Sequence, residues 1–190
     1  MRGNKIEKFM QLGGQSVSKL LHEGTEQQRQ LGARLLLSEV LEYVIYGLGI
    51  EPEIDGVRIK DPDRVTYAVG SAKPDRLEMV DGLADVAYTM YWNACAFGVP
   101  LEEAFDLVCD NNLEKFVKLG RGAEFSPGVL PREAWHCNLG IRWPEEVAQV
   151  SVIKVADEYY AVGKDSRGKV RKPSSYTSVD LLPLVNQAAA

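Results

Sequence analysis

Two carboxylates stand one helical turn apart in an otherwise apolar stretch of the sequence. Glu39 and Glu42 lie in "LLLSEVLEYVIYGLG", residues 35–49, where most other side chains are apolar. Residues three or four apart share one face of a helix. Because burying an ionised group without a partner is costly, this pattern predicts that something neutralises the pair. A cation is the simplest candidate.

A second acidic face lies in "DRLEMVDGLADVAYTMYW", residues 75–92. It places Glu78, Asp81 and Asp85 at positions i, i+3 and i+7, which one helical face can carry. Two antiparallel helices with such faces form an all-oxygen cage, and carboxylate oxygens are the ligands that Mg²⁺ and Mn²⁺ prefer. The sequence therefore predicts Mg²⁺ or Mn²⁺ as the cofactor.

Other acidic pairs and other chemistries carry less weight. With 27 Asp and Glu in 190 residues, acids fall at helical spacing by chance, and we interpret Glu102, Glu103, Asp106 and Asp110 as a solvated face. The chain has two histidines, three cysteines without C-x-x-C spacing and no phosphate-binding glycine loop. A histidine-rich zinc site, a disulfide framework and a P-loop are therefore not supported.

Four helices are expected to position the carboxylates. The first spans residues 4–12; the second follows Thr25 as N-cap and runs to the glycines at 47–49; the third spans 75–97; and the fourth runs from Leu101 to near "KLGRG", residues 118–122. Thr25 and Pro100 favour helix starts, and the glycines favour helix ends. Between the second and third helices, residues 51–72 indicate a hairpin-like connection.

After residue 118 the sequence pattern changes from helices to loops and short strands. Residues 150–173 read as short strands with turns at 156–158 and at "KDSRG". We therefore predict an all-α fold, a four-helix core over residues 1–118. To it is added a loop-rich extension over 119–190, a small β-hairpin or meander.

The charge and hydrophobicity of the sequence limit which partners the protein can bind. A net charge of −5 and a pI near 5.2 provide no basic footprint for stable nucleic-acid binding. The N-terminus lacks the apolar core of a signal peptide, and no apolar run approaches the length of a membrane span. We expect a cytoplasmic protein that does not enter the membrane.

The motifs in their order resemble a known family. "LLLSEVLEYV", then "VDGLADVAYTMYWNACAFGVPLEEAFDLVCDNNLEKF", then "GKVRKPSSY" are similar to the MazG-like nucleoside triphosphate pyrophosphohydrolases, particularly the phage-encoded members. The resemblance covers residues 32–116 and 168–185. It implies an all-α protein that assembles as a homo-oligomer, a dimer or tetramer. It also implies hydrolysis of a (deoxy)nucleoside triphosphate, with dGTP one candidate, to the monophosphate and pyrophosphate, and an extension over 119–190 that completes the nucleotide site.

The resemblance also implies roles for single residues. Glu39, Glu42 and Asp85 fall on the family's acidic signature, and Gly82 stands where the family has a further Glu, so that Asp81 or Glu78 on the same face would substitute. Glu39 and Glu42 would be catalytic, with Glu39 the expected general base. The residues expected to bind the nucleotide are Asn112, Lys115, Lys169, Lys172, Tyr176 and Trp92, the last two being alternatives for stacking on the base.

A rival hypothesis needs no catalysis. In this hypothesis the protein is a helical binding module. Its acidic face binds a partner, and its extension over residues 119–190 is an interaction surface. Incubation with each nucleotide and a divalent cation distinguishes the two.

Overall fold

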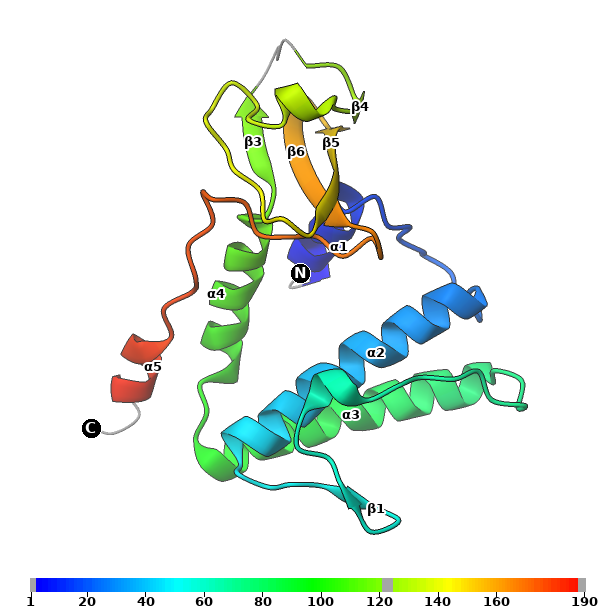
Figure 1. The fold of residues 1–190 in the computed structure, drawn as a ribbon. Helices are drawn as coiled ribbons and strands as arrows, with labels where there is room; N and C mark the ends of the chain where they lie inside the picture. The colour runs from blue at the N-terminus through cyan, green and yellow to red at the C-terminus, as the bar shows by residue number, and fades with distance from the viewer. Residues whose placement is uncertain (1–2, 121–124, 188–190) are drawn as a thin grey trace. The chain divides into compact units, whose positions relative to one another are not determined.

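The computed structural model describes residues 3–120 and 125–187 (Figure 1). These described residues form five α-helices, six strands and three short π or 3₁₀ segments. Their order is α1 Gly3–Leu12, α2 Glu26–Glu42, η1 Tyr43–Gly47, β1 Glu53–Ile54, β2 Val57–Arg58, η2 Pro62–Arg64, α3 Arg76–Phe97, α4 Leu101–Leu113, β3 Val117–Gly120, β4 Gly128–Val129, η3 Arg132–Ala134, β5 Val147–Val155, β6 Glu158–Asp165 and α5 Leu182–Gln187. The chain divides into two compact units: the α2 unit, residues 20–87, and the sheet unit, residues 1–19 and 88–190.

The α2 unit begins with a capped helix. The Thr25 hydroxyl accepts the backbone N–H of Gln28, while the Gln28 side chain accepts the backbone N–H of Thr25, which is the capping box that the sequence indicates. After Glu42 the helix widens into the π-helical segment η1. The hairpin β1–β2 follows, and Asp55 and Gly56 turn it with φ of 51° and 77°, the left-handed values of a tight hairpin turn.

Helix α3 begins behind a side-chain cap and is shared by both units. The Asp75 carboxylate accepts the backbone N–H groups of Leu77 at 2.7 Å and Glu78 at 3.3 Å. The division between the units falls within this helix, after Ala87. Gly98, with φ of 64°, ends α3, and Pro100 precedes α4. The helices predicted over residues 4–12 and 75–97 are thus confirmed, and the one predicted from Thr25 to the glycines at 47–49 is confirmed as α2 with η1, its last five residues being π-helical.

The sheet unit is built on four antiparallel strands in the order β3-β6-β5-β4. The long hairpin β5–β6 is its centre, and its turn at Ala156 has the left-handed φ of 53°. One buried cluster combines Val117 of the edge strand β3, Ala161 of β6 and Val147 and Val150 of β5 with Cys137. A second cluster packs Leu12 of α1 and Phe116 against Tyr160 and Val162 of β6. Helix α1 is therefore part of this core.

The predicted all-α four-helix core is wrong. The structure is 43% helical and 16% strand, a mixed α/β protein. Most of its buried apolar side chains belong to the sheet unit and not to a helical bundle. Helix α4 ends at Leu113, and residues 117–120, expected to continue it, form β3 beside β6; residues 121–122 lie outside the described part. Short apolar runs such as "FVKL" fit a helix or a strand equally, so the tertiary partner decides.

No helix among the described residues is long and apolar enough to cross a membrane.

Candidate functional site

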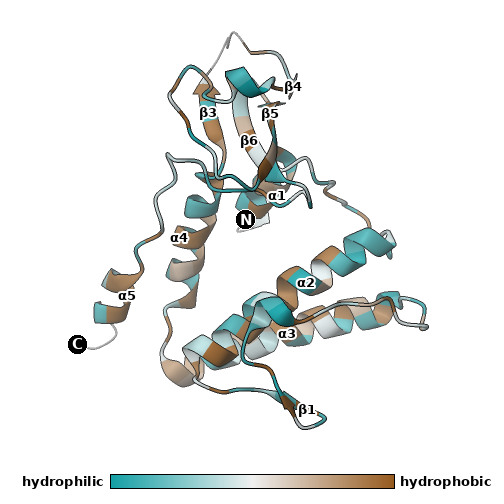
Figure 2. Cartoon of the chain, viewed as in Figure 1, coloured by the Kyte–Doolittle hydropathy of each residue, from teal (hydrophilic) through white to brown (hydrophobic). Residues whose placement is uncertain are grey.

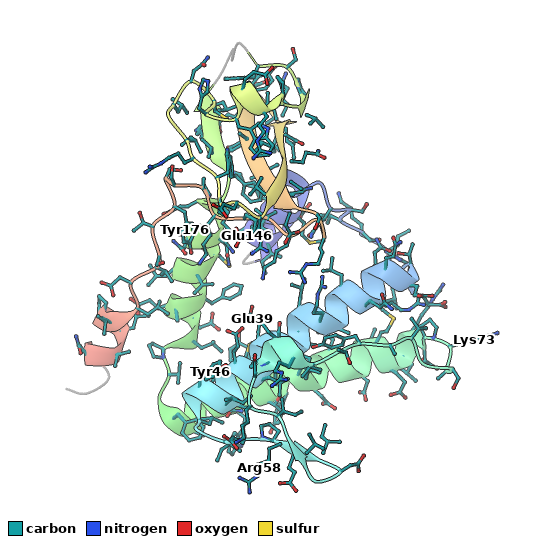
Figure 3. The ribbon with its side chains drawn as sticks, viewed as in Figure 1. Glu39, Tyr46, Arg58, Lys73, Glu146 and Tyr176 are labelled. Atoms are coloured by element: carbon teal, nitrogen blue, oxygen red, sulfur yellow. The ribbon has the colours of Figure 1, made fainter. Side chains whose placement is uncertain are left out.

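Glu39 and Glu42 lie in the last turn of α2, directly before the π-helical segment (Figure 3). The backbone N–H of Leu48 donates to the Tyr43 carbonyl at 2.9 Å, a π-type bond over five residues, so the wider helix begins directly after Glu42. Short π-helical segments are frequent at functional sites. Both carboxylates are exposed. Within one chain they therefore reach water, and the burial that the apolar sequence indicates is not present.

Glu78, Asp81 and Asp85 are exposed on α3. At their spacing they occupy one side of this helix, as expected. Gly82 lies between them with open space around it, since nothing within 4 Å would meet an added Cβ. Among the described residues no group of three or more His, Cys, Asp or Glu side chains is placed to hold a metal ion. One chain therefore presents two separate acidic faces and not a closed cage.

The apolar neighbours of these carboxylates are exposed as well. In residues 20–87, all of which the structure describes, Leu41 and Pro62 are the only buried residues. Figure 2 shows apolar and polar residues interleaved along α2 and α3. Large apolar side chains at least 36% exposed on α2, η1 and α3 are Leu35, Leu36, Leu37, Val40, Tyr43, Tyr46, Leu77, Met79, Val80, Leu83, Tyr88, Met90, Tyr91, Trp92 and Phe97. Those from Leu35 to Leu83 belong to the α2 unit, and an exposed set of this size marks an interaction surface on that unit.

The nucleotide-binding residues predicted near the end of α4 lie within the sheet unit. The Lys115 ammonium donates to the Asn112 side-chain oxygen at 2.6 Å and lies 5.8 Å from the centre of the Phe9 ring. The Lys172 ammonium lies 4.7 Å from the centre of the Tyr176 ring. The structure thus brings Asn112 to Lys115 and Lys172 to Tyr176. Trp92 is 58% exposed on α3 and belongs to neither pair.

Asn111 ties the C-terminal segment to α4, and sequence reasoning missed it. Its buried side chain accepts a hydrogen bond from the Tyr176 hydroxyl and donates to the Thr177 carbonyl at 2.6 Å. The two partners are 65 and 66 residues away along the chain, so no local sequence pattern predicts these hydrogen bonds. This link holds Tyr176, and with it Lys172, beside the helix that carries Asn112.

Asp165 organises the loop that displays Lys169 and Lys172. One carboxylate oxygen accepts the backbone N–H groups of Arg167 and Lys169, both at 2.9 Å. The other pairs with the Arg171 guanidinium at 2.8 Å, and the Asp165 side chain is only 5% exposed. Burial alone would raise the pKa of Asp165, but the two N–H groups and the Arg171 charge outweigh it and lower that pKa. The loop is therefore fixed by an ionised, buried carboxylate.

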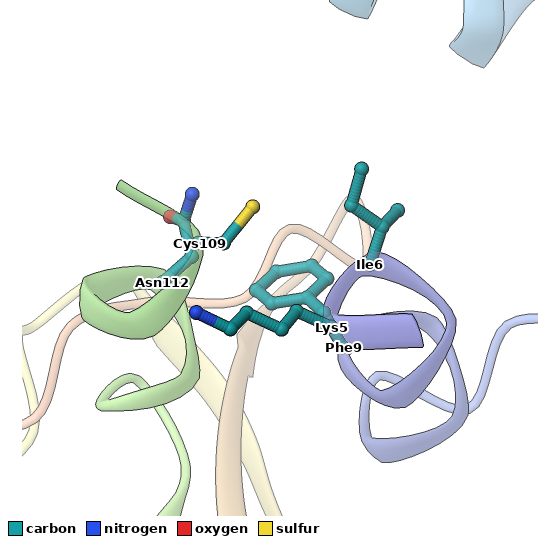
Figure 4. A pocket seen from close by; sticks show the side chains of 5 residues that line it. All are labelled: Lys5, Ile6, Phe9, Cys109 and Asn112. Carbon is teal, nitrogen blue, oxygen red and sulfur yellow. The ribbon is translucent and has the colours of Figure 1, made fainter. Parts of the chain in front are cut away.

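A pocket between α1 and α4 adds residues that the sequence did not indicate (Figure 4). We name it the α1–α4 pocket; it has a volume of about 150 Å³, and its lining is Lys5, Ile6, Phe9, Cys109 and Asn112. The Lys5 ammonium pairs with Asp110 at 2.8 Å and Asp106 at 3.7 Å. The hydrogen bond to Asp110 raises the pKa of Lys5, which keeps this residue a cation. The pocket thus joins an apolar wall to charged and amide groups.

Comparison with known proteins adds no assignment. No protein-family model matches the chain, and no match is found among curated proteins or solved structures. The functional interpretation therefore depends on the residues, on their geometry and on the resemblance seen in the sequence.

Proposed function

We propose that this protein is a metal-dependent nucleoside triphosphate pyrophosphohydrolase, which cleaves a (deoxy)nucleoside triphosphate between its α- and β-phosphates. The ordered resemblance to the MazG-like enzymes supports this proposal. The observation that carries it is the composition of the exposed surface of α2 and α3, where Glu39, Glu42, Asp81 and Asp85 alternate with large apolar side chains. Covering the apolar side chains would desolvate the acids, and desolvated acids need a cation.

We propose that a second copy of the chain covers the apolar side chains of α2 and α3. Residues 20–87 bury only Leu41 and Pro62, too little apolar surface to hold a unit of this size together. Obligate homodimer interfaces resemble a core cut in half, and the exposed apolar residues of α2 and α3 have that character. The resemblance points the same way, since it implies a homo-oligomer. Association would supply to each copy the core that the α2 unit lacks.

The donor set fits Mg²⁺ or Mn²⁺ by its chemistry. All the candidate ligands, Glu39, Glu42, Glu78, Asp81 and Asp85, are carboxylates, and hard divalent cations prefer oxygen. Each helix offers only part of a coordination shell, which agrees with a site completed by association. When bound, the cation would neutralise the phosphate oxygens and lower the pKa of a coordinated water.

The chain's own residues then have distinct tasks. Glu39 accepts the proton of the attacking water as the new bond from oxygen to the α-phosphorus forms. The bond between that phosphorus and the bridging oxygen breaks, and pyrophosphate leaves with the electron pair. Lys115 and Lys172 hold phosphate oxygens by charge-assisted hydrogen bonds, for which the ammonium is a suitable donor. Lys169, exposed on the Asp165 loop, adds positive charge near the same segment.

The proposal is tested by conservative substitutions at the carboxylates. Glu39→Gln, Glu42→Gln and Asp85→Asn should each lower kcat by about 100-fold or more, because each removes a ligand or the base and keeps the shape. Glu103→Gln is the matched control, since Glu103 is exposed in the first turn of α4. Equal, mild effects at all four positions would show that the acids are only solvated. Release of pyrophosphate from none of the triphosphates would favour the binding-module hypothesis.

A further inference from the structure

The α1–α4 pocket has a wall suited to a flat aromatic ring. The Phe9 ring packs edge-on against Phe116, with ring centres 5.1 Å apart and planes at 74°, so its position is fixed by the core. Ile6 and Cys109 extend the apolar lining on either side, one from each helix (Figure 4). Flat aromatic ligands gain from stacking against such side chains. The enclosed volume of about 150 Å³ is below the roughly 300–1,000 Å³ of sites for drug-sized ligands and suits one planar ring.

The polar groups of the pocket are hydrogen-bond donors. The Asn112 side-chain oxygen is taken by Lys115, and in the part of the chain that the structure describes no partner is found for its amide nitrogen. The Lys5 ammonium has three N–H groups; one is hydrogen-bonded to Asp110 at 2.8 Å, and Asp106 lies at ion-pair distance, 3.7 Å. These two aspartates each direct one carboxylate oxygen to Lys5, and neither lines the pocket. A ligand in this pocket meets donors and so must present acceptors.

We propose that the α1–α4 pocket binds the nucleobase of the substrate and prefers bases that present a carbonyl oxygen, guanine, uracil or thymine, over bases that present an amino group there, adenine or cytosine. Guanine offers O6 and N7, and uracil and thymine offer O4, whereas adenine and cytosine turn an amino donor toward the Asn112 amide nitrogen. This inference rests on the proposed function for its choice of a nucleotide ligand. In this proposal Phe9 and Ile6 contact the base. From the sequence alone, Trp92 and Tyr176 are the alternatives for that contact.

The test measures binding without hydrolysis. The full chain, without added metal, is titrated with GMP, UMP, AMP and CMP, and dissociation constants are measured by ligand-observed NMR. GMP and UMP should bind about 10-fold more tightly than AMP and CMP, which is a typical effect of one well-placed hydrogen bond. Asn112→Asp keeps the oxygen that Lys115 contacts and replaces the donor nitrogen by an acceptor, so the preference should reverse toward AMP and CMP. Asn4→Asp, the same change on the exposed part of α1, should leave the ratio unchanged.

A second variant blocks the pocket and leaves the core in place. Ile6 is 45% exposed, so Ile6→Trp fills the pocket from the surface and should weaken all four monophosphates about 10-fold or more. The inference is overturned if no monophosphate binds, if the four bind equally, or if Asn112→Asp leaves the ratio as it was. Base preference without hydrolysis of any triphosphate would overturn the proposed function, whereas the binding of a base in the α1–α4 pocket would be supported. Hydrolysis with no response to Ile6→Trp would overturn the pocket alone.

Discussion

Asp81 is the residue of α3 that tests the proposed cation site most sharply. Gly82 offers no ligand where the family that the sequence resembles has a Glu, so under the proposed function the missing oxygen comes from a neighbour on the same helix. Asp81→Asn should raise the Mn²⁺ concentration for half-maximal hydrolysis about 10-fold, because removing a carboxylate from an oxygen cage costs both charge and a bond. Glu78→Gln should be milder, since Glu78 lies in the first turn of α3, where the helix dipole favours an acid.

The measurement is initial rate against Mn²⁺ concentration for both variants beside Asp85→Asn. Asp81→Asn should resemble Asp85→Asn. If the dependence on Mn²⁺ changes for Glu78→Gln and stays as in the wild type for Asp81→Asn, the ligands of α3 lie one turn away from the assigned ones.

Asp165 makes the stability of the sheet unit depend on pH. The folded-state pKa of Asp165 is lowered, so its contribution is present above the unfolded pKa of about 3.9 and is lost as the pH falls through the lower folded value. Asp165→Asn should cost about 3 kcal/mol at pH 7, because it leaves the partly buried Arg171 unpaired. The free energies of unfolding in urea at pH 7 and pH 3 measure this. A difference between wild type and variant that does not shrink at pH 3 would mean that the ion pair does not hold the loop.

At the scale of elements, Gly163 sets how Trp143 packs on β6. A Cβ at Gly163 would lie 2.7 Å from Cζ3 of Trp143, whose indole N–H donates to the Trp135 carbonyl at 2.9 Å. Gly163→Ala should therefore lower the free energy of unfolding by about 1–3 kcal/mol through overpacking.

Gly32→Ala is the matched control for this change. Gly32 lies inside α2 with nothing within 4 Å of an added Cβ, so the alanine should stabilise the helix by about 0.5–1 kcal/mol. Thermal unfolding followed by circular dichroism compares the two. An unchanged melting temperature in Gly163→Ala would show that Trp143 can move away without cost.

Helix signals in this sequence are local, and that is why the helices could be predicted. Thr25 and Gln28 cap α2 from within four residues, and Gly13 and Gly98 follow their helices directly. The strand β3 could not be predicted, because Val117 pairs with Ala161, and nothing in the intervening loop indicates it. The same distinction between local and tertiary contacts decides which site residues could be predicted. Asn112 and Lys115 meet through a three-residue spacing, whereas Lys5, Phe9 and Asn111 contribute through contacts that only the packed sheet unit creates.

At the scale of the whole molecule, the exposed apolar residues of α2 and α3 predict self-association. The wild-type protein should be at least a dimer at micromolar concentration, because leaving so many large apolar side chains in water is unfavourable. Leu83→Lys places a charge on the 63% exposed Leu83 of α3 and should shift the mass toward the monomer. Val129→Lys, at a 66% exposed position on β4, should not. Light scattering after size-exclusion chromatography gives the masses, and a wild-type monomer contradicts the proposed assembly.

The central claim is metal-dependent release of pyrophosphate from a nucleoside triphosphate, and ³¹P NMR of the reaction tests it most directly. The full chain is mixed in turn with each ribo- and deoxyribonucleoside triphosphate, with Mg²⁺ or Mn²⁺ and then with excess EDTA. We predict that at least one triphosphate is converted to its monophosphate and pyrophosphate with the metal, and that EDTA stops the conversion. No conversion of any triphosphate, orthophosphate as the first product, or turnover that persists in EDTA would contradict the claim.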